Sequence, residues 1–251
     1  MILRDAGALV IGGSRGLGLG LAEALVARGA RVAVAARGEA SLAEAQARLG
    51  GATAVAADAT DVVAVRRLLA EGRPDLVVLA AGAPPPMERI DLMSWEDYSA
   101  NWNADARAGL TLVQIALTLP LSPGSLVVLV SSGAAIAGSP LSGGYAAAKR
   151  ALWFQAQYAQ GLSDQMGLSL RFRILVPRQM VAGTGTGDAG IAGYAAAAGE
   201  SFEARAATWP AMPPRRFGDM VADAIEATGL AEAPVFAIRG DTGLTEVEGA
   251  A

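Results

Sequence analysis

The sequence predicts an α/β fold in which a parallel sheet carries helices on both faces. Short apolar runs bounded by turn residues alternate with segments of helical periodicity over the first two thirds of the chain. The first of these units holds a glycine-rich turn, residues 12–18, between an apolar run and a helical pattern. With 251 residues, 53% of them hydrophobic, the chain is expected to form a single domain, 1–251, around its own core.

Each element follows from its local pattern. Continuous apolar runs are typical of strands buried in a parallel sheet, and they occur at 8–11, 31–36, 52–57, 75–80, 125–131, 168–176 and 234–239. Helical patterns occur at 17–27, 39–49, 61–71, 94–119, 145–166 and 215–227. Residues 182–199 are rich in glycine, alanine and threonine, so we expect a mobile loop there, within a substrate lid that extends to about residue 214, rather than a linker. The residues after 239 are expected to form a loose tail.

Composition excludes several classes of function. The chain has no cysteine and no histidine, which eliminates a thiol nucleophile, a Ser-His-Asp triad, a histidine-based zinc site and an imidazole base. The net charge of −4 gives no basic footprint for nucleic acid, and no apolar run approaches the ~18 residues of a membrane span. Residues 1–5 lack a signal-peptide layout. We therefore expect a cytoplasmic protein without a metal, nucleic-acid or membrane partner.

The glycine-rich turn is a candidate site for a dinucleotide pyrophosphate. Gly12, Gly16 and Gly18 tolerate positive φ angles and lack the Cβ that would keep a ligand off the backbone. The start of the following helix offers unpaired N–H groups and a partial positive charge. The alternative interpretation is that the glycines only allow a tight turn and bind no ligand.

Tyr145 and Lys149 are candidates for proton transfer. They are four residues apart at the start of an expected helix, so their side chains project from one face. An ammonium within about 4–6 Å lowers the pKa of a tyrosine from ~10, and Tyr145 could then exchange protons near neutral pH. Ser132 ends the fifth expected strand, where its hydroxyl would hold a carbonyl oxygen. The alternative interpretation is that Tyr145 and Lys149 lie on a solvated helix face without a catalytic role.

Taken together, these motifs resemble those of the short-chain dehydrogenase/reductase family, in its branch of about 250 residues, over residues 7–180. The matching positions are the three glycines, Asp58 after the third strand, Ser132 thirteen residues before Tyr145, and the pair Tyr145 and Lys149. The resemblance implies a Rossmann-like sheet of seven strands in the order 3-2-1-4-5-6-7, a nicotinamide cofactor, and hydride transfer between that cofactor and a carbonyl/alcohol pair. It assigns general acid/base catalysis to Tyr145, tuning of Tyr145 and ribose binding to Lys149, and carbonyl polarisation to Ser132. The cofactor contacts that we predict are Gly12, Ser14, Arg15, Gly16, Leu17, Gly18, Arg37, Asp58, Ala59, Ala81, Gly82, Tyr145, Lys149 and Pro177.

Several residues depart from the family pattern. Ile11 replaces a threonine, Leu79-Ala80-Ala81-Gly82 replaces the sequence NNAG, and Pro177-Arg178 replaces Pro-Gly. Thr184 lies later than the threonine that usually contacts the carboxamide. At Ile11 and at residues 79–82 the family contacts its cofactor largely through the backbone. We therefore expect that these changes do not prevent cofactor binding.

Asp105 aligns with the family's fourth catalytic residue, an asparagine, while Asn103 is out of register by two. A carboxylate near Lys149 would stabilise the ammonium and leave Tyr145 less strongly perturbed. Alternatively, Asp105 points away and caps or solvates the helix. The predicted catalytic set is thus Ser132, Tyr145, Lys149 and Asp105.

The residues after the second strand indicate the form of the cofactor. Ala36 stands where an NAD-preferring member carries an acid for the ribose 2′-hydroxyl. Arg37 and Arg15 could instead bind a 2′-phosphate, which predicts NADP(H). The alternative interpretation is that Arg15 and Arg37 are solvated surface arginines that bind no phosphate.

We therefore expect an NADP(H)-dependent ketoreductase or alcohol dehydrogenase. The alternatives are a nucleotide-binding protein of the same fold without redox activity, serving as a regulator or assembly subunit, and a dehydratase or isomerase. The expected pocket walls, 134–144 and 182–212, are mostly small and apolar, with Arg178 and Arg205 as candidate anchors, and this favours a hydrophobic or aromatic ketone.

The resemblance also implies a homodimer or homotetramer, because family members commonly pair two long helices across subunits. In this sequence those two helices carry apolar residues on more than one side, many of which must be core; they are Trp102, Leu110, Val113, Leu117, Leu152, Trp153 and Tyr158.

Overall fold

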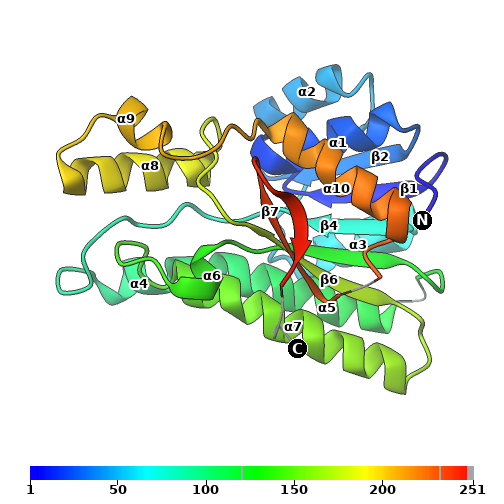
Figure 1. The fold of residues 1–251 in the computed structure, drawn as a ribbon. Helices are drawn as coiled ribbons and strands as arrows, with labels where there is room; N and C mark the ends of the chain where they lie inside the picture. The colour runs from blue at the N-terminus through cyan, green and yellow to red at the C-terminus, as the bar shows by residue number, and fades with distance from the viewer. Residues whose placement is uncertain (120, 232, 248–251) are drawn as a thin grey trace.

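The protein is an eight-stranded sheet with helices packed on both faces, as a computed structural model describes it for residues 1–119, 121–231 and 233–247 (Figure 1). The sheet has the order β3-β2-β1-β4-β5-β6-β7-β8. Its strands are β1 (Gly7–Ile11), β2 (Arg31–Ala36), β3 (Thr53–Ala56), β4 (Leu76–Leu79), β5 (Leu126–Val130), β6 (Arg171–Pro177), β7 (Val235–Arg239) and β8 (Gly243–Glu246). Strands β1 to β7 pair in parallel, which confirms the predicted fold class and the order of the first seven strands.

The eighth strand corrects the prediction of seven strands and a loose tail. β8 pairs antiparallel with β7, with Leu244 opposite Ile238. Gly243 adopts a φ of +72°, which lets the chain reverse within a few residues. Arg239 and Asp241 form an ion pair of 2.9 Å next to this turn. Residues 248–251 of the expected tail lie outside the described residues.

Two helical layers enclose the sheet. The helices are α1 (Gly16–Ala27), α2 (Glu39–Arg48), α3 (Val62–Gly72), α4 (Trp95–Asn101), the π turn η1 (Trp102–Ala106), α5 (Arg107–Thr118), α6 (Ala134–Ala137), α7 (Tyr145–Gln165), α8 (Gly185–Ala198), α9 (Phe202–Ala206) and α10 (Pro214–Thr228). One core cluster joins α1, α2 and α10 to one face of the sheet, and a second joins α3, α5 and α7 to the other. Within the described ranges, no helix is both long and apolar enough to cross a membrane.

Helix α8 corrects the expectation of a loop at 182–199. Thr184 caps its N-terminus, because Gly187 N–H donates to Thr184 Oγ1 at 3.1 Å. Gly199 ends it in the left-handed conformation at φ +67°. Helices α8 and α9 lie together beyond one edge of the sheet. The β4–α4 connection and α6 lie across from them (Figure 1).

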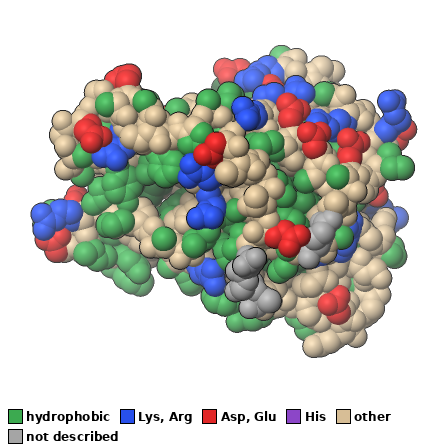
Figure 2. Space-filling model, viewed as in Figure 1, with side chains coloured by type: hydrophobic (Ala, Val, Ile, Leu, Met, Phe, Trp, Pro, Cys, Tyr) green, Lys and Arg blue, Asp and Glu red, His purple; other side chains and the backbone are tan. Residues whose placement is uncertain are grey.

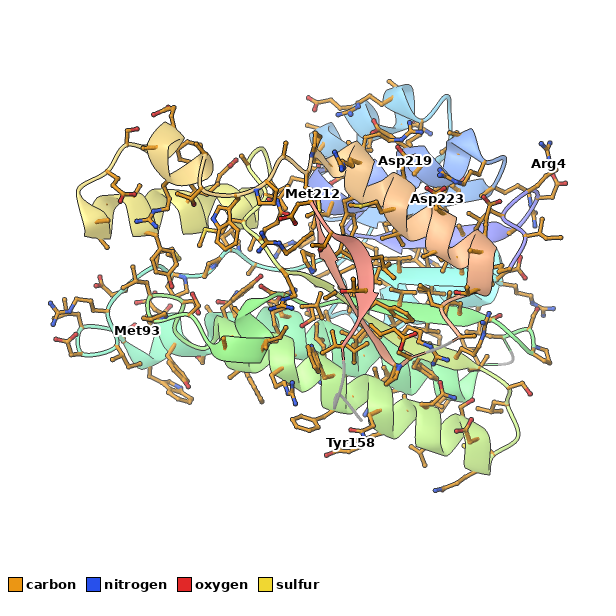
Figure 3. The ribbon with its side chains drawn as sticks, viewed as in Figure 1. Arg4, Met93, Tyr158, Met212, Asp219 and Asp223 are labelled. Carbon is orange, nitrogen blue, oxygen red and sulfur yellow. The ribbon has the colours of Figure 1, made fainter. Side chains whose placement is uncertain are left out.

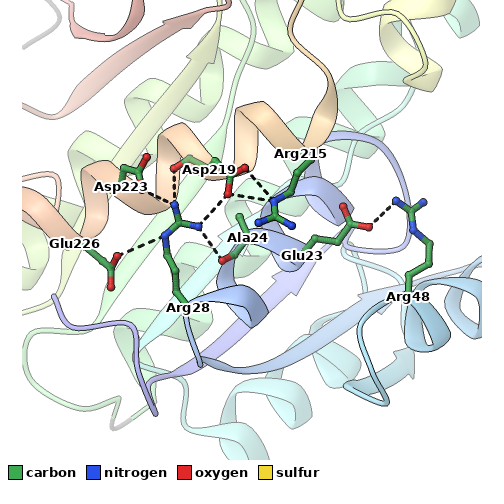
Figure 4. A network of polar contacts seen from close by, with 8 residues as sticks. All are labelled: Glu23, Ala24, Arg28, Arg48, Arg215, Asp219, Asp223 and Glu226. Atoms are coloured by element: carbon green, nitrogen blue, oxygen red, sulfur yellow. Dashed lines mark hydrogen bonds and ion pairs between the residues drawn. The ribbon is translucent and has the colours of Figure 1, made fainter.

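Helices α1 and α10 are held together by close backbone approach and by ion pairs (Figure 4). A Cβ on Gly20 would collide with the backbone of Pro214, and one on Gly218 with the backbone of Gly20. Around this contact, Arg28 pairs with three acidic residues of α10, which are Asp219 at 3.0 Å, Asp223 and Glu226 at 3.5 Å. This packing fixes α1, which begins at the glycine turn, along its length against α10.

Candidate active site

The glycine turn forms a close-packed junction between β1 and α1. Gly12 and Gly16 have φ angles of +87° and +57°. A Cβ on Gly12 would collide with the backbone of Ala81, and one on Gly18 with the carbonyl of Gly12. No side chain caps α1, whose N-cap residue is Arg15, so its first-turn N–H groups have no side-chain acceptor. A backbone cradle without side chains at an uncapped helix start fits a dinucleotide pyrophosphate.

A continuous cleft of about 950 Å³ runs over the carboxyl ends of the strands. It lies where the strand order reverses between β1 and β4, the usual ligand position in open parallel sheets. Ser132 and all the cofactor contacts predicted from the sequence line this cleft; the latter are Gly12, Ser14, Arg15, Gly16, Leu17, Gly18, Arg37, Asp58, Ala59, Ala81, Gly82, Tyr145, Lys149 and Pro177. Asp105 does not line it.

Charged residues gather at the end of the cleft beside β2 and β3. Arg15 and Arg37 are both exposed there, and Ala36 ends β2 without a carboxylate. Asp58 accepts hydrogen bonds from the N–H and the hydroxyl of Thr60, each at 2.8 Å. The N–H of Thr60 holds the pKa of Asp58 below its usual value against the effect of burial, so Asp58 is ionised at neutral pH.

Tyr145 and Lys149 lie buried at the start of α7, beside the end of β5. Lys149 Nζ lies 5.8 Å from the centroid of the Tyr145 ring, and each residue is 6% exposed. The side chain of Ser132 lies close enough to the Tyr145 hydroxyl to act on its pKa, which it lowers. Ser131 fixes the helix to the strand, since its hydroxyl donates to the Lys149 carbonyl and accepts from Trp153 Nε1, both at 2.8 Å.

Asp105 lies behind Lys149, in the π turn η1. Its Oδ1 is 2.7 Å from Lys149 Nζ, and its side chain is fully buried. Its Oδ2 accepts from Asn101 Nδ2 at 3.2 Å and from Ala83 N–H at 3.3 Å. Lys149 Nζ also donates to the Val130 carbonyl at 3.3 Å. Asp105 therefore does not point to solvent but forms a buried ion pair.

Comparison with known proteins identifies the family. Residues 6–170 match the family described as short chain dehydrogenase. The chain belongs to the short-chain dehydrogenase family. A solved structure titled short chain dehydrogenase/reductase family protein superposes with a TM-score of 0.71 at 25% identity, over 88% of this chain and 90% of its own.

Curated relatives in this family match over part of their length. Hydroxynaphthalene reductase arp2 of Aspergillus fumigatus is 36% identical over 157 residues, which are 58% of this chain and 56% of the relative. Short-chain dehydrogenase/reductase FrzI of Cladobotryum sp is 36% identical over 160 residues, which are 60% and 61% of the two chains. The chain thus spans a little over half the length of the curated relatives it matches.

The electrostatics of this short-chain dehydrogenase site differ from what the spacing of Tyr145 and Lys149 predicts. Burial raises the pKa of Tyr145 above its ordinary value; the Lys149 ammonium and the Ser132 side chain act in the opposite direction, and the Asp105 charge adds to the rise. Burial alone would lower the pKa of Lys149, but the charges of Asp105 and Tyr145 raise it. In this structure burial, together with the Asp105 charge, therefore shifts the pKa of Tyr145 away from neutrality, which is opposite to the direction expected from Lys149 alone.

The outer half of the cleft is largely apolar (Figure 2). Its walls include Met87, Ile136, Met180, Tyr194 and Trp209. The Tyr194 hydroxyl of α8 is 2.7 Å from the Ser139 hydroxyl, so the wall is continuous between α8 and the α6–α7 connection.

The two arginines that the sequence suggested as substrate anchors, Arg178 and Arg205, differ in position. Arg178 lines the cleft at the end of β6, whereas Arg205 pairs with Glu200 at 2.9 Å and is not part of its lining.

Two residues near the site were missed in the sequence. Met87 follows three consecutive prolines after β4 and approaches Gly193 of α8 so closely that a Cβ there would collide with it. Asn101 lies one helical turn before Asp105, and this spacing could have indicated the contact between their side chains. Asn103, by contrast, is exposed on the cleft wall.

Proposed function

We propose that this chain is an NADP(H)-dependent carbonyl reductase. The observation that carries the proposal is the convergence of Ser132, Tyr145 and Lys149 on one cleft, next to the glycine cradle between β1 and α1. The reductase names of curated relatives support a redox function over a non-redox one.

The residues of the cleft have distinct tasks in this proposal. The cradle of Gly12, Gly16 and Gly18 would hold the pyrophosphate, and Lys149 would bind the nicotinamide ribose. A nicotinamide cofactor bound there supplies the hydride that the carbonyl carbon receives. Ser132 donates a hydrogen bond to the carbonyl oxygen, and Tyr145 gives its hydroxyl proton to that oxygen, so that an alcohol and a tyrosinate result. The tyrosinate is then reprotonated from solvent.

NADP(H) is favoured over NAD(H) by charge. Arg15 and Arg37 offer exposed guanidinium groups at one end of the cleft, where forked donors bind a phosphate well. Ala36 supplies no carboxylate for the ribose 2′-hydroxyl that NAD(H) carries.

An apolar or aromatic ketone is the proposed substrate class. The outer walls of the cleft offer methionine, isoleucine and aromatic side chains, which are suited to a flat apolar ring. A relative whose name specifies hydroxynaphthalene reduction supports an aromatic substrate. Residues 182–214 would form the lid over it, since α8 and Trp209 contribute to the same wall.

A nucleotide-binding role without redox activity is the second candidate. The observation that favours it is the ion pair between Asp105 and Lys149, which engages the ammonium that would otherwise bind the nicotinamide ribose.

One experiment separates the two candidates. NADPH and NADH binding is measured by calorimetry, and NADPH oxidation is followed with a panel of aromatic and aliphatic ketones. Turnover of any ketone supports the reductase. Tight NADPH binding without turnover across the panel supports the non-redox role.

A further inference from the structure

The ion pair between Asp105 and Lys149 places a buried negative charge next to the proton-transferring group. The pair is 2.7 Å long, and both side chains are at least nine-tenths buried. Asp105 is held from its other side by Asn101 and by the Ala83 N–H. Water cannot screen charges in such a position effectively, so their effect on a neighbour is strong.

Few charges act on the Tyr145 hydroxyl. Lys149, on the same helix, favours the tyrosinate, whereas Asp105, from η1, favours the neutral phenol. Arg178 and Arg239 line the same cleft from the ends of β6 and β7, but the charges that shift the pKa of Tyr145 are those of Lys149 and Asp105. Because these two charges oppose each other, burial of the phenol determines its protonation.

We propose that Asp105 is a positioning residue that neutralises the Lys149 ammonium from behind the cleft and keeps the Tyr145 hydroxyl in the protonated form that carbonyl reduction uses. The direction of reaction rests on the proposed function, whereas the protonation of Tyr145 does not. In reduction, the carbonyl carbon gains a hydride and the oxygen gains the phenolic proton. The reverse oxidation needs a tyrosinate to take the proton from the alcohol, and Asp105 makes that form scarce at neutral pH.

The first test is ionisation of Tyr145, which needs no turnover. Tyrosinate absorbance is titrated with pH in the parent and in Tyr145→Phe, and the difference isolates one of the four tyrosines. In the parent, Tyr145 should ionise only above the ordinary ~10. An ionisation near neutrality in the parent would overturn the proposal.

The second test removes the charge but keeps the shape. In Asp105→Asn, the ionisation of Tyr145 should move to lower pH by about one unit or more, the effect of an unopposed ammonium. The alkaline limb of the ketone-reduction profile should move with it, and alcohol oxidation at neutral pH should rise by about tenfold. An unchanged Tyr145 ionisation in this variant contradicts the proposal.

A matched control separates this effect from a general change of charge. Asp164→Asn removes an exposed carboxylate near the far end of α7, where Asp164 contacts Gln160, and should leave the Tyr145 titration unchanged. Thermal melting shows whether Asp105→Asn is folded, and if it is not, the parent titration still decides. If no ketone is reduced, the proposed function fails while the titration retains its meaning.

Discussion

Arg15 and Arg37 are the residues on which the choice of cofactor depends. Each charge-assisted contact to a 2′-phosphate is worth roughly 1.5–3 kcal/mol. NADPH should therefore bind more tightly than NADH, and changing both arginines to alanine should weaken NADPH binding by about tenfold or more while NADH binding changes little. Calorimetric dissociation constants for both nucleotides measure this.

The control for this prediction is another exposed arginine. Arg4 lies at the opposite end of the molecule from the cleft's outer half, near the N-terminus (Figure 3). Arg4→Ala should bind both nucleotides as the parent does. Equal dissociation constants of NADPH and NADH in the parent would exclude the role given to Arg15 and Arg37.

Tyr145→Phe removes the transferable proton and keeps the buried ring. The fold and the nucleotide affinity should change little, whereas ketone reduction should fall by about 10²–10⁴-fold, the usual worth of general acid–base catalysis. Tyr98→Phe removes a hydroxyl from a tyrosine that stacks on Trp95 outside the cleft lining, and should retain activity. Near-parental turnover in Tyr145→Phe would show that another group is the acid.

At the scale of elements, the sequence predicts well the helices and strands whose local pattern of apolar residues is strong. The buried strands are continuous apolar runs, such as Leu126–Val130, and the parallel topology brings their carboxyl ends together. This topology explains why Gly12 and Tyr145, which the family resemblance assigned to one site, line the same cleft.

The elements that were missed depend on tertiary contacts. Helix α8 has three glycines among its first six residues and no amphipathic stripe, so its local sequence does not favour a helix. The Thr184 cap and packing around Ile191 stabilise it nonetheless. Similarly, the π turn η1 departs from the 3.6-residue repeat, so the burial of Asp105 and the exposure of Asn103 could not be read from spacing.

Helix α8 should change its dynamics when the cleft is filled. Few of its side chains are buried, and Thr184 at its start lies close to Gly16 of the glycine turn. Amide exchange in 182–199 should therefore slow on addition of NADPH and slow further with a ketone product, while α3, which lies on the other face of the sheet from α1, should be unaffected. Unchanged fast exchange in the saturated complex would mark 182–199 as an inert linker rather than a lid.

At the scale of the whole molecule, one outer face is more apolar than a solvated surface needs to be. Phe154, Tyr158 and Leu162 follow one another at four-residue spacing on α7 and are 44%, 65% and 45% exposed. Trp102 of η1 and Leu110 of α5 are also about half exposed. Tyr158 points away from the sheet, on the outer side of α7 (Figure 3). Val113, Leu152 and Trp153, in contrast, are buried in the core.

This face should pair with a second copy of the chain. An exposed apolar face of this kind favours self-association, and a two-fold axis would bring α7 of one copy against the same helix of the other. Sedimentation analysis should give two or four times the chain mass of 25.3 kDa. Replacing Tyr158 and Leu162 by aspartate should yield a folded monomer, because both side chains project outward and leave the core intact. Val63→Asp, at a 77% exposed position on α3, should keep the oligomer. A monomeric parent would show that the apolar face of α7 has another purpose.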